Sequence, residues 1–266
     1  MTTDRQMQIL NYLTRHESLE VNQLSELLQT SASTIRRELK IMEENGLLVR
    51  NHGNAHLHVP IRYELPFEKR ATQQAEAKRE IAIQAAQLIK PGQVIGLSGG
   101  TTTTELARQL RLVENLTIVT SALNVALELQ GQLSKRVMVT GGILNQESYE
   151  LAGDQAVQSL RNVHLDIVFH GASGIDVDFG ISLADEPDAV VGRAFKEAAN
   201  KIIIVADHSK IGHKTFARFC ALNEVDMLIT DHRVSEVQQS MLKAGGLDFV
   251  AAGGEIGPGT MFSRGV

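Results

Sequence analysis

The sequence predicts an α/β protein in two parts: a small N-terminal winged helix-turn-helix, and a larger domain built on a mainly parallel sheet. The first 60 residues show three short helical patterns followed by two alternating segments that suit a β-hairpin. From Gln93 onward, short apolar runs alternate with amphipathic helical stretches. A chain of 266 residues is long enough for two domains, one small and one with a substantial core.

The N-terminal part contains the elements of a DNA-binding head. Apolar residues at helical spacing predict three helices, and two alternating segments with a turn between them predict a hairpin. The helices fall around residues 9–13, 21–28 and 31–42, and the strands at 46–50 and 55–59. A small helical bundle with a solvated basic face is the alternative, but it leaves unexplained why a hairpin directly follows the basic helix.

The third predicted helix has one apolar and one basic face. Ile35, Leu39 and Met42 recur at helical spacing and are expected to face the core. Ser31 is expected to cap the helix, because its hydroxyl can accept a hydrogen bond from a first-turn amide. Small residues in the first turn allow close approach to base edges, and arginines further along can reach phosphates and guanines. The residues expected to contact DNA are Ser31, Ser33, Thr34, Arg36, Arg37, Lys40, Arg50 and His52.

Three histidines lie in or beside the predicted hairpin. His56 and His58 share one face of its second strand, and His52 lies in the turn. Because no cysteine or acidic partner lies nearby, contact with DNA phosphate explains these histidines better than a metal ion does. The sequence predicts no metal site and no cofactor.

The charge balance limits how the head can bind DNA. The chain carries 26 Lys/Arg and 31 Asp/Glu, a net charge of −5, whereas residues 1–70 contain nine of each sign. The head is therefore neutral, and the remainder carries the whole negative charge. DNA affinity must come from the placement of a few basic residues.

Composition also limits the compartment. The single cysteine, Cys220, excludes an intramolecular disulfide and suits a reducing cytosol. No apolar run approaches the ~20 residues needed to span a bilayer, and the N-terminus lacks the apolar stretch of a signal peptide. We expect a cytoplasmic protein with no membrane partner.

One residue pattern runs through the whole head. It consists of an arginine, two spaced aliphatic residues, a gap, and then the third helix, and its members are Arg5, Ile9, Leu13, Ser31, Thr34, Ile35, Arg36, Arg37 and Leu39. This pattern resembles that of the DeoR family of bacterial transcriptional regulators. Glu38 stands where the family usually has Asp. Its extra methylene is expected to shift a local hydrogen bond without abolishing the fold.

Four regions follow from these patterns. We expect a DNA-binding domain at residues 1–58, a linker at 59–77 that holds two prolines and a charged run, an effector domain at 78–252, and a flexible Gly-rich tail at 253–266. The effector domain has seven candidate strands, at 94–97, 116–120, 136–140, 165–169, 202–206, 225–230 and 248–251. Its candidate helices are 103–111, 122–130, 187–200 and 234–244. Sheets of this kind bind ligands at the carboxyl ends of their strands.

The loop after the first of these strands has the chemistry of an anion site. Glycines let the backbone approach an anion, threonine hydroxyls donate hydrogen bonds, and the following helix presents free amides. The loop is neither a Walker A sequence nor a G-x-G-x-x-G turn, and an ordinary strand-to-helix turn is the alternative. The residues expected to bind a phosphorylated ligand here are Ser98, Gly99, Gly100, Thr101, Thr102 and Thr103.

Five residues elsewhere on the same predicted edge complete the candidate site. Ser121 and Asn124 could hydrogen-bond sugar hydroxyls or merely cap a helix, and Gly142 ends the third strand. Lys210 could neutralise a phosphate or be a solvated surface lysine. Glu186 precedes a helix, where a carboxylate is favoured by the helix dipole even without a ligand.

The resemblance to the DeoR family extends into this domain. The family's sensor domain is similar to ribose-5-phosphate isomerase and typically binds a phosphorylated sugar. Its first loop commonly reads Asp-x-Gly-Thr-Thr; Gly100, Thr101 and Thr102 match, whereas Ser98 replaces the acid that binds hydroxyls. An Asp-x-Ser-Lys motif matches at Asp207–Lys210. The run from Gly153 to Leu160, with the preceding Thr-Gly-Gly, resembles the branch that senses amino-sugar phosphates.

Two enzymatic functions are alternatives to a regulatory one. Gly96–Gly100 satisfies the G-x-S-x-G pattern of a serine hydrolase, but the threonines after it suit anion binding better. The isomerases of this fold carry acids around a Gly-Ala pair, whereas here His170 and Ser173 flank Gly171–Ala172, so the catalytic carboxylates are absent. We therefore expect no catalytic residue.

These observations lead to one expected function. We expect a repressor of a sugar or amino-sugar utilisation operon that binds double-stranded operator DNA and is relieved by a phosphorylated sugar. One winged head reads only a short half-site, so the protein is expected to act as a homo-oligomer, a dimer or a tetramer.

Overall fold

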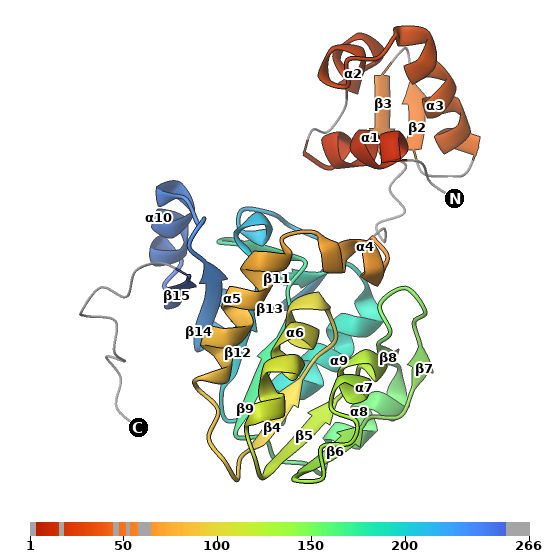
Figure 1. The fold of residues 1–266 in the computed structure, drawn as a ribbon. Coiled ribbons are helices and arrows are strands. Elements are labelled where there is room, and N and C mark those ends of the chain that lie inside the picture. Colours follow the sequence, from red (N-terminus) through yellow and green to blue (C-terminus); the bar gives the residue numbers. More distant parts are fainter. Residues whose placement is uncertain (1–3, 16–18, 45–47, 52–53, 58–64, 254–266) are drawn as a thin grey trace. The chain divides into compact units, whose positions relative to one another are not determined.

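The computed structural model describes residues 4–15, 19–44, 48–51, 54–57 and 65–253. The chain divides into two units, Met1–Tyr63 and Glu64–Val266, and each is considered by itself (Figure 1). The division falls within the segment 59–77 that the sequence suggests as a linker. Helix α4 (Phe67–Thr72) and the start of α5 (Ala75–Ala86) lie in the same segment and belong to the second unit. Except for Gly253, the expected tail lies outside the described residues.

The first unit is a winged helix-turn-helix, as predicted. Its helices are α1 (Asp4–Arg15), α2 (Val21–Leu27) and α3 (Ala32–Glu44), and its hairpin consists of β2 (Leu48–Asn51) and β3 (Asn54–Leu57). A two-residue strand that the sequence does not predict, β1 (Leu19–Glu20), pairs with β3 and extends the wing to the order β1-β3-β2. Ile35, Leu39 and Met42 are fully buried, so the predicted apolar face of α3 is confirmed.

Glu38 joins α3 to α1. Its carboxylate is buried and accepts a hydrogen bond from Gln6 Nε2 at 2.7 Å, and Arg5 Nη1 lies 3.8 Å from its other oxygen. A buried carboxylate needs such partners to offset its desolvation. The longer acid at this position therefore makes an interhelical contact inside the head.

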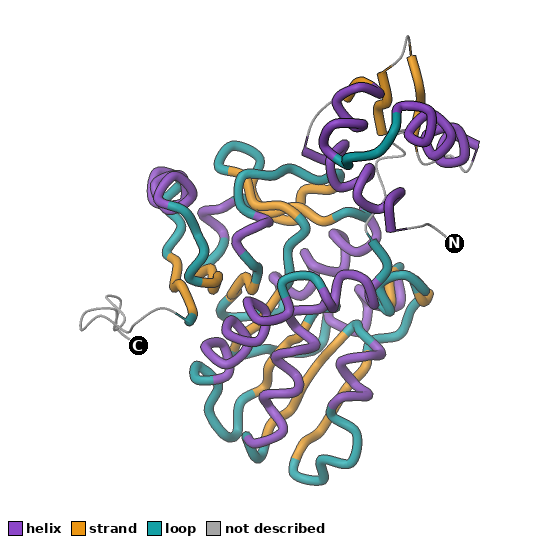
Figure 2. The backbone as a smooth tube through the Cα atoms, turned by 45° about the horizontal axis from the view of Figure 1, so that its top comes forward, coloured by secondary structure: helices purple, strands orange, loops and turns teal. Residues whose placement is uncertain are grey.

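The second unit is built on a seven-stranded sheet in the order β15-β14-β12-β9-β4-β5-β6, with every neighbouring pair parallel (Figure 1). Figure 2 shows its strands in orange among the purple helices. Its strands are β4 (Val94–Leu97), β5 (Leu116–Thr120), β6 (Lys135–Val139), β9 (Ile167–His170), β12 (Ile202–Val205), β14 (Met227–Asp231) and β15 (Phe249–Ala252). All seven segments predicted as strands lie in this sheet, with bounds that differ by at most two residues. The predicted mainly parallel sheet is confirmed.

Helices cover both faces of the sheet. One face packs against α5, α6 (Thr101–Gln109) and α7 (Leu123–Glu128), and the other against α8 (Asp154–Leu160), α9 (Glu186–Glu197) and α10 (Glu236–Ala244). Successive residues of a strand point to opposite faces. On β9, Val168 belongs to one core cluster and Phe169 to the other. A strand buried on both faces reads as a continuous apolar run, and this explains why the sequence identifies the sheet.

Short elements that the sequence does not predict complete the unit. Strands β7 (Ile143–Leu144) and β8 (Leu151–Ala152) form a hairpin, and a second antiparallel sheet has the order β10-β11-β13. The remaining bounds are β10 (Gly174–Asp176), β11 (Gly180–Leu183), β13 (Ala217–Cys220), and the 3-10 turns η1 (Leu110–Leu112), η2 (His208–Lys210) and η3 (Leu222–Glu224). Strands β7, β8 and β10 have only two or three residues, too few to show a hydrophobic period.

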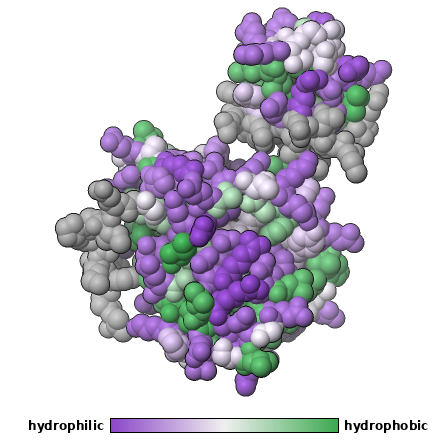
Figure 3. Space-filling model, viewed as in Figure 1, coloured by the Kyte–Doolittle hydropathy of each residue, from purple (hydrophilic) through white to green (hydrophobic). Residues whose placement is uncertain are grey.

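Several large apolar side chains of the second unit are exposed. Leu112, Leu133 and Ile143 are 90%, 99% and 79% exposed. On the face seen in Figure 3, hydrophobic side chains form separate groups among hydrophilic ones. Within the described part of the chain, no helix is long and apolar enough to cross a membrane.

The β7–β8 hairpin depends on a close backbone approach at Gly142. Its φ is +133°, and a Cβ atom there would lie 2.5 Å from the carbonyl oxygen of Ala152. Gly131 also has a positive φ, +78°, but nothing lies within 4 Å of its Cβ position. Both glycines adopt a backbone conformation that disfavours other residues, but only Gly142 also has a close neighbour that leaves no room for a Cβ atom.

This difference predicts unequal costs of the same substitution. Gly131→Ala should cost about 1–2 kcal/mol, the strain of an L-residue at positive φ, whereas Gly142→Ala adds an overpacking cost of about 1–3 kcal/mol. Differential scanning calorimetry of the full-length variants measures both. Equal melting temperatures for the two variants would contradict the close approach at Gly142.

Candidate functional site

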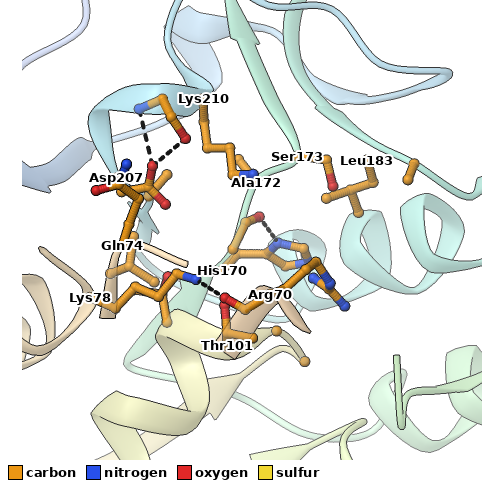
Figure 4. A pocket seen from close by; sticks show the side chains of 18 of the residues that line it. Arg70, Gln74, Lys78, Thr101, His170, Ala172, Ser173, Leu183, Asp207 and Lys210 are labelled. Carbon is orange, nitrogen blue, oxygen red and sulfur yellow. Dashed lines mark hydrogen bonds between the residues drawn. The ribbon is translucent and has the colours of Figure 1, made fainter. Parts of the chain in front are cut away.

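The pocket of the second unit lies at the carboxyl ends of β4, β9 and β12 in the centre of the sheet (Figure 4). From β4 the chain continues to β5 and β6 on one side, and then crosses to β9, β12, β14 and β15 on the other. In open parallel sheets, ligands bind at such a switch point. The lining residues are Arg70, Gln73, Gln74, Lys78, Gly99, Gly100, Thr101, Thr102, Glu150, His170, Gly171, Ala172, Ser173, Leu183, Ala184, Asp188, Val205, Ala206, Asp207, Ser209 and Lys210.

The loop between β4 and α6 supplies one wall. Gly100 precedes the helix with a φ of +116°, and its carbonyl accepts hydrogen bonds from Thr103 Oγ1 at 2.9 Å and Thr104 Oγ1 at 2.7 Å. These two hydroxyls are thus used inside the first turn, and the fully buried Thr103 does not line the pocket. Thr101 and Thr102 line it, at the end of α6 where amides lack helical partners.

Ser98 ties β4 to β9 and does not line the pocket. It is buried, its Oγ donates to the Gly99 carbonyl at 3.0 Å, and it accepts from the Gly171 amide at 3.1 Å. A hydrolase nucleophile needs a base within hydrogen-bond reach. The two hydrogen-bond partners of this hydroxyl are the Gly99 carbonyl and the Gly171 amide, both backbone groups.

Four other predicted ligand residues lie outside the pocket lining. Ser121 follows β5, where its carbonyl accepts from the Leu151 amide at 2.7 Å, so the β7–β8 hairpin covers this end of the strand. Asn124 Nδ2 donates to Thr104 Oγ1 at 2.7 Å and links α7 to α6. Gly142 serves the hairpin itself. Glu186 opens α9, and its carboxylate lies 3.7 Å from Arg193.

Among the residues that the structure describes, three cationic side chains line the pocket: Arg70 from α4, Lys78 from α5 and Lys210 from η2 (Figure 4). Lys78 is only 6% exposed, and its ammonium donates to the Gln73 carbonyl at 2.7 Å and to the Arg70 carbonyl. Arg70 Nε donates to the Leu65 carbonyl at 2.8 Å. Cations from three separate elements favour an anionic ligand.

Of these cations, the sequence identifies Lys210 alone. Arg70 and Lys78 fall in or beside the segment interpreted as a linker. The sequence does contain one indication that Lys78 has a special environment: it lies in the buried stripe of α5 with Ile81, Ala82 and Ala85. A lysine in an apolar stripe is costly unless it has acceptors, so it indicates a specific environment.

Turn η2 is held rigidly in place. Asp207 is buried and caps the turn by accepting from the Ser209 amide at 3.0 Å. The fully buried Asp231 accepts from the His208 amide at 2.7 Å and from Arg233 Nε at 3.1 Å. Burial alone would raise the pKa of Asp231, but its hydrogen bonds and its attraction to His208 lower the pKa overall. This carboxylate is therefore charged at neutral pH and fixes the turn that carries Lys210.

His170 is a neutral packing residue in the pocket wall. Desolvation lowers its pKa to about 4, and its ring stacks on Phe219 with centroids 4.4 Å apart. Nδ1 donates to the Gly171 carbonyl at 2.7 Å. A Cβ atom at Gly192 would lie 2.8 Å from Nε2, so α9 closes off the second nitrogen.

Glu150 is the acid that lies against the glycine loop. Its Oε2 accepts from the Gly99 amide at 3.2 Å, and its side chain lines the pocket together with Asp188. The sequence pattern does not identify it, because it lies 51 residues after Gly99 and outside every motif.

In the head, the DNA-binding residues predicted for the third helix begin at Ser31, just before α3, and continue along the helix to Lys40. Ser31 Oγ accepts from the Thr34 amide at 3.3 Å, which confirms its role as N-cap. Ser33, Arg36, Arg37 and Lys40 are exposed. Arg50 lies on β2, with its side chain outside the described part, as is all of His52. Among the side chains that the structure describes, none form a group that could hold a metal ion.

Two family models match the chain. The DeoR-like helix-turn-helix domain matches residues 5–59, and the DeoR C-terminal sensor domain matches residues 73–232. The putative aga operon transcriptional repressor of Escherichia coli O157:H7 is 34% identical over 254 residues, covering 95% of this chain and 94% of the relative. The transcriptional repressor GlcR of Bacillus subtilis strain 168 is 32% identical over 247 residues, covering 93% and 95%.

A solved structure is also similar. Ribose 5-phosphate isomerase A from Methanocaldococcus jannaschii aligns with 52% of this chain and 55% of its own, at 18% identity and a TM-score of 0.39, too low to support an argument about function. The two family models and the full-length relatives suffice without it. They confirm the resemblance found in the head motif: the chain belongs to the DeoR family of transcriptional regulators.

Proposed function

We propose that this regulator represses a sugar or amino-sugar utilisation operon and is relieved by a phosphorylated sugar bound in the pocket of its second unit. The observation that carries the proposal is a glycine-threonine loop facing three cations, in a chain that also has a winged helix-turn-helix. Two relatives are named as repressors, one of them of the aga operon.

The pocket suits a phosphate on a small polar molecule. Loop amides and hydroxyls at a helix N-terminus bind phosphate oxygens, and the dipole of the helix favours negative charge. Lys210 and Arg70 add charge-assisted donors from two other elements. Most of the remaining lining is polar, as recognition of a sugar requires.

Binding without turnover is supported by what the pocket side chains do. An isomerase needs a positioned base, whereas His170 is neutral and its Nε2 is covered by α9. A hydrolase needs an accessible serine, whereas Ser98 is buried and bonded to backbone. We therefore propose that the ligand is an effector and leaves unchanged.

We further propose that the protein acts in the cytoplasm as a homo-oligomer, a dimer or a tetramer. One head covers a short half-site, so two or more heads are needed for a specific operator. Exposed apolar side chains such as Leu112 and Leu133 give the second unit surface that a second copy could bury.

Arg70 offers a route from the pocket to the head. Its guanidinium lines the pocket while Nε holds the carbonyl of Leu65, two residues beyond the division between the units. Its helix is held from the other side, since the Phe67 amide donates to the Glu147 carbonyl at 3.0 Å and the Phe67 ring packs edge-on against Tyr149. An anion that attracts the guanidinium would favour one arrangement of this helix over another. An effector shifts an equilibrium only by such differential contacts.

The head residues predict two distinct defects in DNA binding. Arg36→Ala should weaken binding to a selected operator by about 1–3 kcal/mol if it reads a base, and Lys40→Ala should mainly lower the salt slope by about one. Fluorescence anisotropy over a salt series, on DNA enriched from a random pool by the wild-type protein, measures both. Arg161→Ala, an exposed change in the second unit, is the control. Wild-type affinity in both head variants would refute the docking of α3.

The pocket residues predict the converse defect. A thermal-shift screen of hexose and hexosamine phosphates, with the parent sugars as controls, should identify the effector, because stabilisation scales with occupancy. Thr102→Val and Lys210→Gln should weaken its binding at least about tenfold, as expected for lost charge-assisted bonds, and should spare DNA binding. Lys243→Gln removes an exposed charge on α10 and should change neither. Equal loss of DNA and effector binding would refute the two-domain scheme.

The proposed route predicts a variant that binds effector but responds poorly. Arg70→Lys keeps the positive charge but lacks the Nε that holds Leu65, so effector affinity should stay within about threefold while the effector's influence on operator affinity falls. The measurement is the ratio of operator dissociation constants with and without saturating effector. Arg79→Lys, an exposed change on α5, is the matched control. An undiminished ratio in Arg70→Lys would exclude this route.

A further inference from the structure

Three of the described residues that line the pocket are cationic, but the loop at residues 98–102 contains no acidic residue. Ser98 begins this loop, and its hydroxyl is buried and bonded to the backbone of Gly99 and Gly171. Its side chain does not line the pocket. Any carboxylate that reads hydroxyl or ammonium groups must therefore come from another element.

Glu150 lies beside this position. Its Oε2 is 3.2 Å from the Gly99 amide, one residue after Ser98, and it lines the pocket. A Cβ atom at Gly99 would lie 2.1 Å from both Cγ and Cδ of Glu150. The glutamate therefore packs directly on the glycine, and any other residue at 99 would push it away.

The backbone around Glu150 fixes this placement. The Asn145 amide donates to the Glu150 carbonyl at 2.8 Å, and the Tyr149 amide donates to the Asn145 carbonyl at 2.8 Å. Glu150 also forms a bridge with Ala122 at the end of β5. The side chain is thus delivered from a closed turn anchored on the sheet, as a residue that selects a ligand must be.

We propose that Glu150 determines the specificity of the pocket by accepting hydrogen bonds from the hydroxyl or ammonium groups of a phosphorylated sugar. This inference rests on the proposed function, because it assumes a sugar phosphate in the pocket. A carboxylate has about four acceptor sites, so accepting from the Gly99 amide is compatible with accepting from other donors as well. The same negative charge opposes a bare anion at the glycine loop. Glu150 therefore favours a phosphate that carries a sugar over inorganic phosphate.

Glu150→Gln tests this role. Glutamine can still accept from the Gly99 amide, but it loses the charge and replaces one acceptor by a donor. Isothermal titration calorimetry on the full chain should show hexose and hexosamine 6-phosphates binding at least about tenfold more weakly. Inorganic phosphate should bind as tightly as in the wild type or more tightly, which also shows that the loop is folded. Glu147→Gln makes the same change at an exposed position of the same turn and should alter neither affinity.

Two results would overturn the inference. Sugar phosphates that bind Glu150→Gln as well as the wild type would remove its role in recognition. An equal increase in the affinity of Glu150→Gln for sugar phosphates and for inorganic phosphate would show that Glu150 only opposes the phosphate and does not recognise the sugar. A wild-type protein that binds none of these sugar phosphates would instead refute the proposed function, and the inference with it. Glu150→Asp, which keeps the charge on a shorter side chain, should retain part of the discrimination.

Discussion

The second unit depends on how it accommodates one buried charge, the ammonium of Lys78. An unpaired ammonium away from water costs several kcal/mol, so its partners must be fixed. The carbonyls of Arg70 and Gln73 supply them, and both lie in the short stretch between α4 and α5. This stretch turns through Gln74, whose φ of 51° is in the left-handed region. The lysine thus draws α4 onto the body of the unit and makes one wall of the pocket from what would otherwise be linker.

The same interaction places two further cations within reach of one ligand. With α4 fixed, Arg70 lines the pocket opposite the strand ends that carry Lys210. In the proposed function, an anion bound among these cations gains favourable charge–charge interactions. Glu150 places a carboxylate at the glycine loop. In the proposed function, the affinity of the pocket for an anion therefore depends on the balance between its cationic and its acidic groups.

Most of the large-scale fold could be predicted, because its elements repeat a simple pattern over enough residues. Strands such as β12, with Ile202–Val205 buried on both faces, read directly from the sequence. The β7–β8 hairpin could not, since each strand has two residues and is set by the backbone approach at Gly142. Helix α4 could not either, because the polar segment around Phe67–Thr72 gains its structure from contacts with residues 147–149.

The candidate site divides along the same line. Gly99–Thr102 and Lys210 could be found because they directly follow strands, and topology brings strand ends together. Glu150 and Arg70 reach the pocket through tertiary contacts across many residues of sequence, which no local pattern records. Ser121 and Asn124 also follow a strand, yet the hairpin covers that strand end and their side chains lie outside the pocket lining. The rule that ligands bind at the carboxyl ends of parallel strands therefore identifies candidate residues. Which of them line the pocket depends on the segments that cover those strand ends.

The lack of net charge on the head limits how it can bind DNA. Counterion release by many cations would hold a basic head on DNA in any orientation, but residues 1–70 carry no net charge. For the proposed oligomer, binding then depends on Arg36, Arg37 and Lys40 of each head meeting their half-sites together, because a single head contributes few contacts. In that scheme, binding is sensitive to the spacing of the heads, and an effector that shifts α4 through Arg70 would change the occupancy of an operator.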